Sequence, residues 1–160
     1  MALSKLDNLY RAVILDHSSS PRHAGELHTG CMIDLNNPTC GDVIRLTVDF
    51  DGDKIKDIAF SGHGCTISTA SASMMTEAVI GKSKKEAQEL AEFFSAMVTG
   101  TEDERQEALG DAQFLAGVSK FPARVKCSTL AWNALKKAIE TDGNAVGTAI
   151  FGFGNDDSEV

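Results

Sequence analysis

The sequence predicts an α+β fold in which a three-stranded antiparallel sheet, connected as a meander, packs against several helices. Residues 43–50 and 54–60 alternate apolar and polar side chains, which is typical of half-buried strands. Residues 4–16 and 124–142 instead carry apolar side chains at helical spacing. The predicted strands are grouped ahead of most of the helices, and this order favours an antiparallel sheet covered by helices.

Short turns connect the predicted strands. A first strand is expected at residues 32–35, ahead of a loop at residues 36–42. Asp51, Gly52 and Asp53 form a hairpin turn, because an Asp-Gly pair tolerates the positive φ angles that such turns require. Turns this short join strands that run in opposite directions, so the sheet is expected to be antiparallel.

Small residues and capping signals divide the second half of the chain into helices. Residues 66–80 are rich in alanine and serine, which predicts a helix that packs closely on the sheet. Ser83 and Glu86 form a capping box that opens a helix running to about residue 98. Residues 101–121 predict a short acidic helix and a second helical turn before the last long helix.

Length and charge restrict the organisation and the partners. The 160 residues predict one domain at residues 1–143, with an acidic insertion at about residues 101–121 and a flexible acidic tail at residues 144–160. The formal net charge is −8 and no basic patch stands out, which argues against nucleic acid as a partner. No apolar run could span a membrane, and the first residues do not resemble a secretory signal. We therefore expect a cytoplasmic protein with no membrane partner.

The four cysteines are the residues with the most distinctive chemistry: Cys31, Cys40, Cys65 and Cys127. In a reducing cytosol, thiols are more often buried, metal-bound or catalytic than paired in disulfides. No Cys-x-x-Cys spacing indicates a metal site, so the surroundings of each cysteine carry the argument. Cys31 is expected to be a buried thiol on the first strand.

The other three cysteines have comparable surroundings. Cys40 lies in a loop just before a strand, whereas Cys65 and Cys127 lie in the first turns of predicted helices, where the helix dipole favours a thiolate. Asp42 follows Cys40 by two residues, and three thiolates with one carboxylate would complete a tetrahedral zinc site. Each cysteine alone fits a buried core position equally well. The residues by themselves leave a shared site and simple core packing open.

Three segments resemble the NifU N-terminal/IscU superfamily, which serves iron–sulfur cluster assembly. They read Asn-Pro-Thr-Cys-Gly-Asp at 37–42, Gly-His-Gly-Cys-Thr-Ile-Ser-Thr-Ala-Ser-Ala-Ser at 62–73 and Lys-Cys-Ser-Thr-Leu-Ala-Trp at 126–132. The resemblance covers roughly residues 5–142 and implies an IscU-like fold.

Within this superfamily the chain is most similar to the SufU branch. Lys126 stands where IscU-type scaffolds carry a histidine, and the acidic insertion at residues 101–121 resembles the one that SufU proteins carry. The segment at residues 121–126 departs from the Leu-Pro-Pro-Val-Lys motif of IscU, so the resemblance does not imply a dedicated chaperone.

The resemblance implies that Cys40, Asp42, Cys65 and Cys127 bind one zinc ion and that Cys40 accepts sulfur. The implied donor is a persulfide on a SufS-type cysteine desulfurase, whose histidine replaces Cys40 on zinc so that the freed thiol can attack. The expected function is that of a zinc-dependent sulfurtransferase, an enzyme acting with its desulfurase and feeding a SufBCD-type scaffold. The main alternative is an IscU-type scaffold that builds a 2Fe–2S or 4Fe–4S cluster on the same residues. A third alternative is a zinc ion that only stabilises the fold.

The charge of such a site needs compensation. Three thiolates, one carboxylate and Zn²⁺ sum to −2, and burying this charge is costly unless a cation is near. Arg124 and Lys126 flank Cys127, and we expect Arg124 to support catalysis by donating hydrogen bonds to the Cys40 thiolate or its persulfide. His63, in the turn before the small-residue helix, is expected to be structural or exposed. The other histidines, expected at the surface, are His17, His23 and His28.

Overall fold

The computed structural model describes residues 2–27, 30–37, 41–101, 104–141 and 148–152. Its elements, in chain order, are α1 (Ala2–Ser19), β1 (Cys31–Asn37), β2 (Asp42–Asp51), β3 (Lys54–His63), α2 (Thr66–Val79), α3 (Lys84–Val98), the 3₁₀ segment η1 (Glu104–Lys120), α4 (Pro122–Thr141) and β4 (Thr148–Gly152).

The sheet confirms the predicted α+β class and the antiparallel meander of β1, β2 and β3. Asp51 pairs with Lys54, so the hairpin loop consists of Gly52 and Asp53, and Gly52 adopts a φ of 62°. A fourth strand, β4, pairs in parallel with the other edge of β1. This strand was not expected, because residues 144–160 were predicted to form a flexible tail. A five-residue strand in a glycine-rich segment shows no alternation of apolar and polar residues by which the sequence could reveal it.

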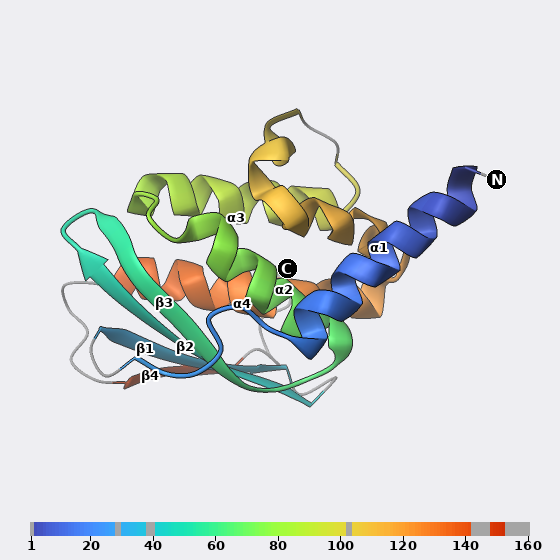
Figure 1. Ribbon diagram of the computed structural model, residues 1–160. Helices are drawn as coiled ribbons and strands as arrows, with labels where there is room; N and C mark the ends of the chain where they lie inside the picture. Colours follow the sequence, from blue (N-terminus) through green and yellow to red (C-terminus); the bar gives the residue numbers. More distant parts are fainter. Residues whose placement is uncertain (1, 28–29, 38–40, 102–103, 142–147, 153–160) are drawn as a thin grey trace.

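Helices cover the sheet in two layers (Figure 1). Helices α2 and α4 lie against the strands, and α3 and η1 pack on the far side of these two helices. Trp132 of α4 joins the layers, since its ring stacks on Phe94 of α3 with centroids 4.6 Å apart. Its indole N–H donates to Ser71 Oγ of α2 over 3.1 Å. Both aromatic side chains are fully buried.

Local signals account for most helix boundaries. The predicted capping box is confirmed at the start of α3, where Ser83 and Glu86 each bond to the other's backbone N–H. In η1, Gly110 has a φ of 61° and separates two helical pieces, which matches the predicted pair of short helices. Helix α4 begins at Pro122, two residues earlier than predicted, because proline fits the first helical position. In the described part of the chain, no helix combines the length and apolar character needed to cross a membrane.

Candidate metal centre

Three of the predicted ligands converge where one end of the sheet meets two helices. Asp42 is the first residue of β2, Cys65 immediately precedes α2, and Cys127 lies in the second turn of α4. The pairing of Val43 with His63 returns the chain to the start of β2, so the next residues begin α2 beside Asp42. One ligand atom from each of Asp42, Cys65 and Cys127 lies within 4.8 Å of the other two.

Hydrogen bonds orient the carboxylate and one thiol. The backbone N–H of Cys65 donates to Asp42 Oδ1 over 2.9 Å, which leaves Asp42 Oδ2 4.0 Å from Cys65 Sγ. Cys65 is the N-cap of α2, and its sulfur accepts the backbone N–H of Ser68 over 3.4 Å. A helix N-terminus favours the thiolate over the thiol, so this position suits a metal ligand or a nucleophile.

Gly64 makes this arrangement possible. A Cβ built at Gly64 would lie 2.7 Å from Asp42 Oδ1 and still closer to Ser68 Oγ. Any side chain there would therefore displace the carboxylate or the serine hydroxyl. The glycine before Cys65 has a steric role, which lets the turn approach Asp42 closely.

The donor set fits a zinc ion. Zn–S bonds of about 2.3 Å and Zn–O bonds of about 2.1 Å separate the donors of a tetrahedral site by about 3.5–3.8 Å. The observed spacing is slightly wider and is within reach of small side-chain rotations. Asp42 and Cys127 are buried and Cys65 is half-buried, so a cation bound here would have one open side. Two soft sulfur donors with one carboxylate suit zinc or iron better than calcium or magnesium.

Arg124 supplies positive charge beside the thiols. The pKa of Arg124 is raised above its ordinary value, chiefly by the negative charges of Cys65 and Cys127 and further by hydrogen bonds to both. We expected this side chain to face Cys40 or its persulfide, but Cys40 lies outside the described residues. In the described part of the chain, the guanidinium lies beside the sulfur atoms of Cys65 and Cys127.

The remaining predicted residues differ in how far the structure describes them. Cys127 lies one turn further into its helix than expected, because α4 begins at Pro122. Cys31 is the first residue of β1, but its side chain is outside the described part. His63 is exposed at the end of β3 and lies outside the described donor group, as expected.

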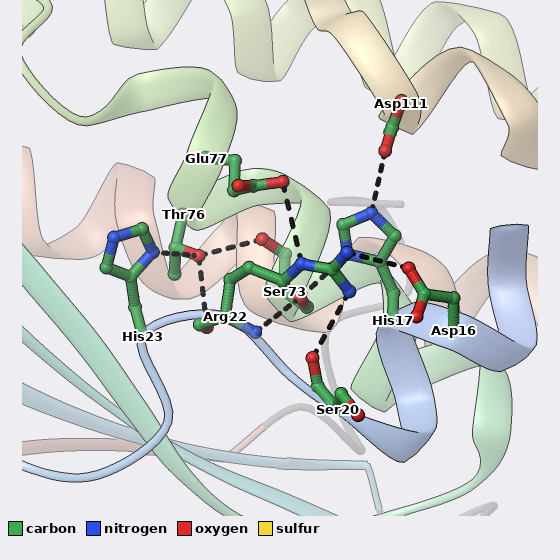
Figure 2. Close-up of polar contacts among 9 residues, drawn as sticks. All are labelled: Asp16, His17, Ser20, Arg22, His23, Ser73, Thr76, Glu77 and Asp111. Atoms are coloured by element: carbon green, nitrogen blue, oxygen red, sulfur yellow. Dashed lines mark hydrogen bonds and ion pairs between the residues drawn. The ribbon is translucent and has the colours of Figure 1, made fainter.

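His17 is buried, contrary to the prediction from the sequence. We expected it at the surface, but its side chain is fully buried between three elements (Figure 2). Nδ1 lies 2.7 Å from Ser73 Oγ of α2, and Nε2 lies 2.9 Å from Asp111 Oδ2 of η1. His23 is half-buried and contacts Thr76, whereas His28 lies outside the described residues. The helical spacing of α1 gave no signal for His17, because its partners are remote in sequence.

His17, Glu77 and Asp111 also form a group with the spacing of metal donors. A cation competes there with Arg22, whose Nε lies 4.0 Å from Glu77 Oε1 and whose Nη2 pairs with Asp16 Oδ2 over 2.6 Å (Figure 2). Both ring nitrogens of His17 already have hydrogen-bond partners. We therefore interpret this group as a polar link between elements.

Comparison with known proteins places the chain in a family. It matches the family described as "NifU-like N terminal domain" over residues 9–128, and it belongs to that family. It is 66% identical to "Iron-sulfur cluster assembly scaffold protein IscU" of Streptococcus pyogenes serotype M1, covering 91% of each chain. It is 52% identical to "Zinc-dependent sulfurtransferase SufU" of Bacillus subtilis strain 168, covering 88% of this chain and 97% of that protein.

A solved structure agrees with the fold. A protein of the thermophile Fervidobacterium islandicum AW-1, described as an iron–sulfur cluster assembly scaffold candidate for the SUF system, superposes with a TM-score of 0.75. The two are 38% identical, and the match covers 79% of this chain and 93% of that chain. The chain therefore belongs to an iron–sulfur cluster assembly family and has its α+β fold.

Proposed function

We propose that this protein is a zinc-dependent sulfur acceptor for iron–sulfur cluster assembly, with Cys40, Asp42, Cys65 and Cys127 as the zinc ligands. The observation that carries the proposal is the meeting of Asp42, Cys65 and Cys127 within 4.8 Å at a half-open site. The name of the Bacillus subtilis relative supports zinc and sulfur transfer. Lys126 supports the same proposal, because its ammonium cannot serve as a fourth ligand in place of histidine.

In the proposed reaction, the sulfur donor is a persulfide on a SufS-type cysteine desulfurase in the cytoplasm. The Cys40 thiolate attacks the outer sulfur of that persulfide, the S–S bond of the donor breaks, and the donor cysteine leaves as a thiolate. A persulfide forms on Cys40, and no external oxidant or reductant is consumed. Zinc, when bound, keeps its cysteine ligands deprotonated at neutral pH. Arg124 compensates the negative charge beside the reacting sulfur, and a SufBCD-type scaffold is the proposed recipient.

Replacing the sulfur acceptor tests this proposal. Cys40→Ala is expected to abolish the acceleration of alanine release from cysteine by a SufS-type desulfurase, because no thiol remains to accept the sulfur. The measurement is alanine formation against the concentration of added protein, with zinc content determined on the same samples. Cys31→Ser is the matched control, since it removes a thiol that belongs to no proposed ligand set. Full acceleration by Cys40→Ala would contradict the proposal.

The scaffold function remains the second candidate, because the Streptococcus pyogenes relative at 66% identity is named a scaffold. A scaffold would carry iron or a transient cluster as its cargo on the same thiols. Anaerobic purification separates the two functions: the zinc protein is colourless, whereas a cluster-bearing protein absorbs visible light. A brown protein that loses its colour in Cys65→Ala and does not accelerate the desulfurase would favour the scaffold. A bound zinc that leaves desulfurase activity unchanged would favour a structural ion.

A further inference from the structure

Two of the three residues that meet at the candidate metal centre are carried by neighbouring helices, α2 and α4. Cys65 is the N-cap of α2, and Cys127 lies in the second turn of α4. The two helices pack against each other (Figure 1). The spacing of the two sulfur atoms therefore depends on the distance between these helices.

The hydroxyl of Ser71, in α2, contacts α4 directly. Its Oγ donates to the backbone carbonyl of Ser128 over 2.5 Å and accepts the indole N–H of Trp132 over 3.1 Å. Ser128 directly follows Cys127 in the chain, and Trp132 lies about one turn further along α4. This one hydroxyl therefore joins α2 to two successive turns of α4, beginning at the residue next to a proposed ligand.

The contact is buried and requires a close approach of the two helices. Ser71 and Ser128 are both fully buried, so water does not compete for the bond. A serine side chain has only one heavy atom beyond Cβ, so the hydroxyl reaches a backbone carbonyl of the other helix only where the two backbones lie close together. Because the side chains at a helix contact set the distance between the helix axes, Ser71 sets this distance near the metal centre.

A second buried serine of α2 provides an internal comparison. Ser73 is also fully buried, but its Oγ contacts the ring of His17 and accepts the backbone N–H of Arg22. These partners belong to α1 and to the segment that follows it, not to α4. Ser71 and Ser73 therefore share their helix, their burial and their chemistry, and they differ in the element that the hydroxyl holds.

We propose that Ser71 is a positioning residue for the metal centre, whose bond to the Ser128 carbonyl holds Cys65 and Cys127 at the spacing that zinc requires. The inference rests on the proposed function for the identity of the ion. Without the hydroxyl, α4 is free to shift relative to α2, and a site with Zn–S bonds of about 2.3 Å tolerates little change in sulfur spacing. Groups that orient metal ligands without touching the metal contribute about 10–100-fold to affinity.

The two serines allow a matched test in the full chain. Ser71→Ala should raise the dissociation constant for zinc by about ten-fold or more, measured by competition with a chromophoric chelator. Ser73→Ala is the control and should keep the wild-type constant. Both variants lose buried hydrogen bonds, so both should unfold at a lower urea concentration than wild type. Wild-type zinc affinity in Ser71→Ala, or an equal loss of affinity in both variants, overturns the inference.

Trp132→Phe separates the two bonds that the Ser71 hydroxyl makes. This change removes the indole N–H but leaves the bond to Ser128, so zinc affinity should stay near wild type although stability falls. Ser71→Ala combined with Trp132→Phe should keep the affinity loss of Ser71→Ala, because the bond to Ser128 is still missing. Recovery of wild-type affinity in this double variant would show that the hydroxyl only satisfies the indole, and it would overturn the inference.

A measurement without zinc separates this inference from the proposed function. With Cys31→Ser and Cys40→Ala, the only thiols left in the chain are Cys65 and Cys127. Phenylarsine oxide bonds through its arsenic to two neighbouring thiols and releases water, so its affinity reports the spacing of these two sulfurs. Adding Ser71→Ala should weaken its binding by about ten-fold, whereas the matched serine control should not. This result supports the positioning role even if the wild-type protein accepts no sulfur, and unchanged arsenical affinity overturns it.

Discussion

Arg124 shows how one exposed side chain can act on the site without being a ligand. Its pKa is raised chiefly by the negative charges of Cys65 and Cys127, which stabilise the protonated guanidinium. The guanidinium is exposed, so the effect on folding is expected to be small. Its larger effect is expected on the thiolates, whose negative charge it offsets during proposed sulfur transfer.

Replacing Arg124 should therefore slow sulfur acceptance without emptying the site. Arg124→Ala is expected to keep near-normal zinc content and to lower the rate of persulfide formation by about ten-fold, the effect of losing one charge-assisted hydrogen bond. Single-turnover labelling of the persulfide measures this rate, and Arg124→Lys, which keeps the charge, should recover part of it. A wild-type rate in Arg124→Ala would show that the guanidinium has no part in the transfer.

At the scale of elements, His17 links α1 to both α2 and η1. Ser73 Oγ accepts the backbone N–H of Arg22 over 2.8 Å, so its own proton is available to His17 Nδ1. The ionised carboxylate of Asp111 can only accept, so His17 Nε2 donates the hydrogen bond to it. The link holds η1 against α1, and residues of both elements line a groove that also includes Cys65.

Removing the imidazole should destabilise the protein. His17→Ala leaves a cavity and takes a partner from the buried Ser73 hydroxyl, which together cost about 2–4 kcal/mol of unfolding free energy. Urea denaturation measures this loss, and His63→Ala, an exposed histidine, should stay within about 0.5 kcal/mol of wild type. Hydrogen exchange should rise in η1 before it rises in α3. Equal stability of the two alanine variants would contradict the link.

At the scale of the whole molecule, the candidate metal centre brings together side chains from three separate elements of the fold. Asp42 lies at the end of the interior strand β2, whereas Cys65 is the N-cap of α2 and Cys127 belongs to α4. A bound ion would therefore stabilise the folded chain relative to the unfolded chain, which has no preformed site. The stabilisation grows with the ratio of free metal to dissociation constant and reaches about 4 kcal/mol at a ratio of about 1,000.

Zinc removal should lower the melting temperature. Chelation is expected to shift it down by several degrees, since about 1 kcal/mol moves a domain of this size by about 2–4 °C near its melting point. Differential scanning calorimetry of zinc-loaded and chelated protein measures the shift, and Asp42→Ala should remove most of the difference. A melting temperature that does not respond to chelator would contradict zinc binding at this site.

Much of the architecture follows from local patterns in the sequence. The alternation of residues 43–50 and 54–60 predicts β2 and β3, and the Asp-Gly pair predicts their hairpin. The serine and glutamate of the capping box predict the start of α3. These features are predictable because strands, turns and caps depend on residues that are close together in the chain.

Other features could not be read from local patterns. Strand β4 forms by pairing with β1, more than 100 residues earlier in the chain, as the register of Met32 with Thr148 shows. His17 is buried by Ser73 and Asp111, which are 56 and 94 residues away. A polar residue at the end of an amphipathic helix resembles a surface residue until these distant partners are known.

The sequence by itself determined the order of the helices and of the first three strands, and the cysteine motifs that mark this family, because these depend on short stretches of chain. Only the tertiary structure decided that Asp42, Cys65 and Cys127 meet, that Arg124 lies beside the thiols, and that a hydroxyl of α2 bonds to the backbone of α4. The physical reason is that donor spacing, burial and surface charge arise where separate elements pack together.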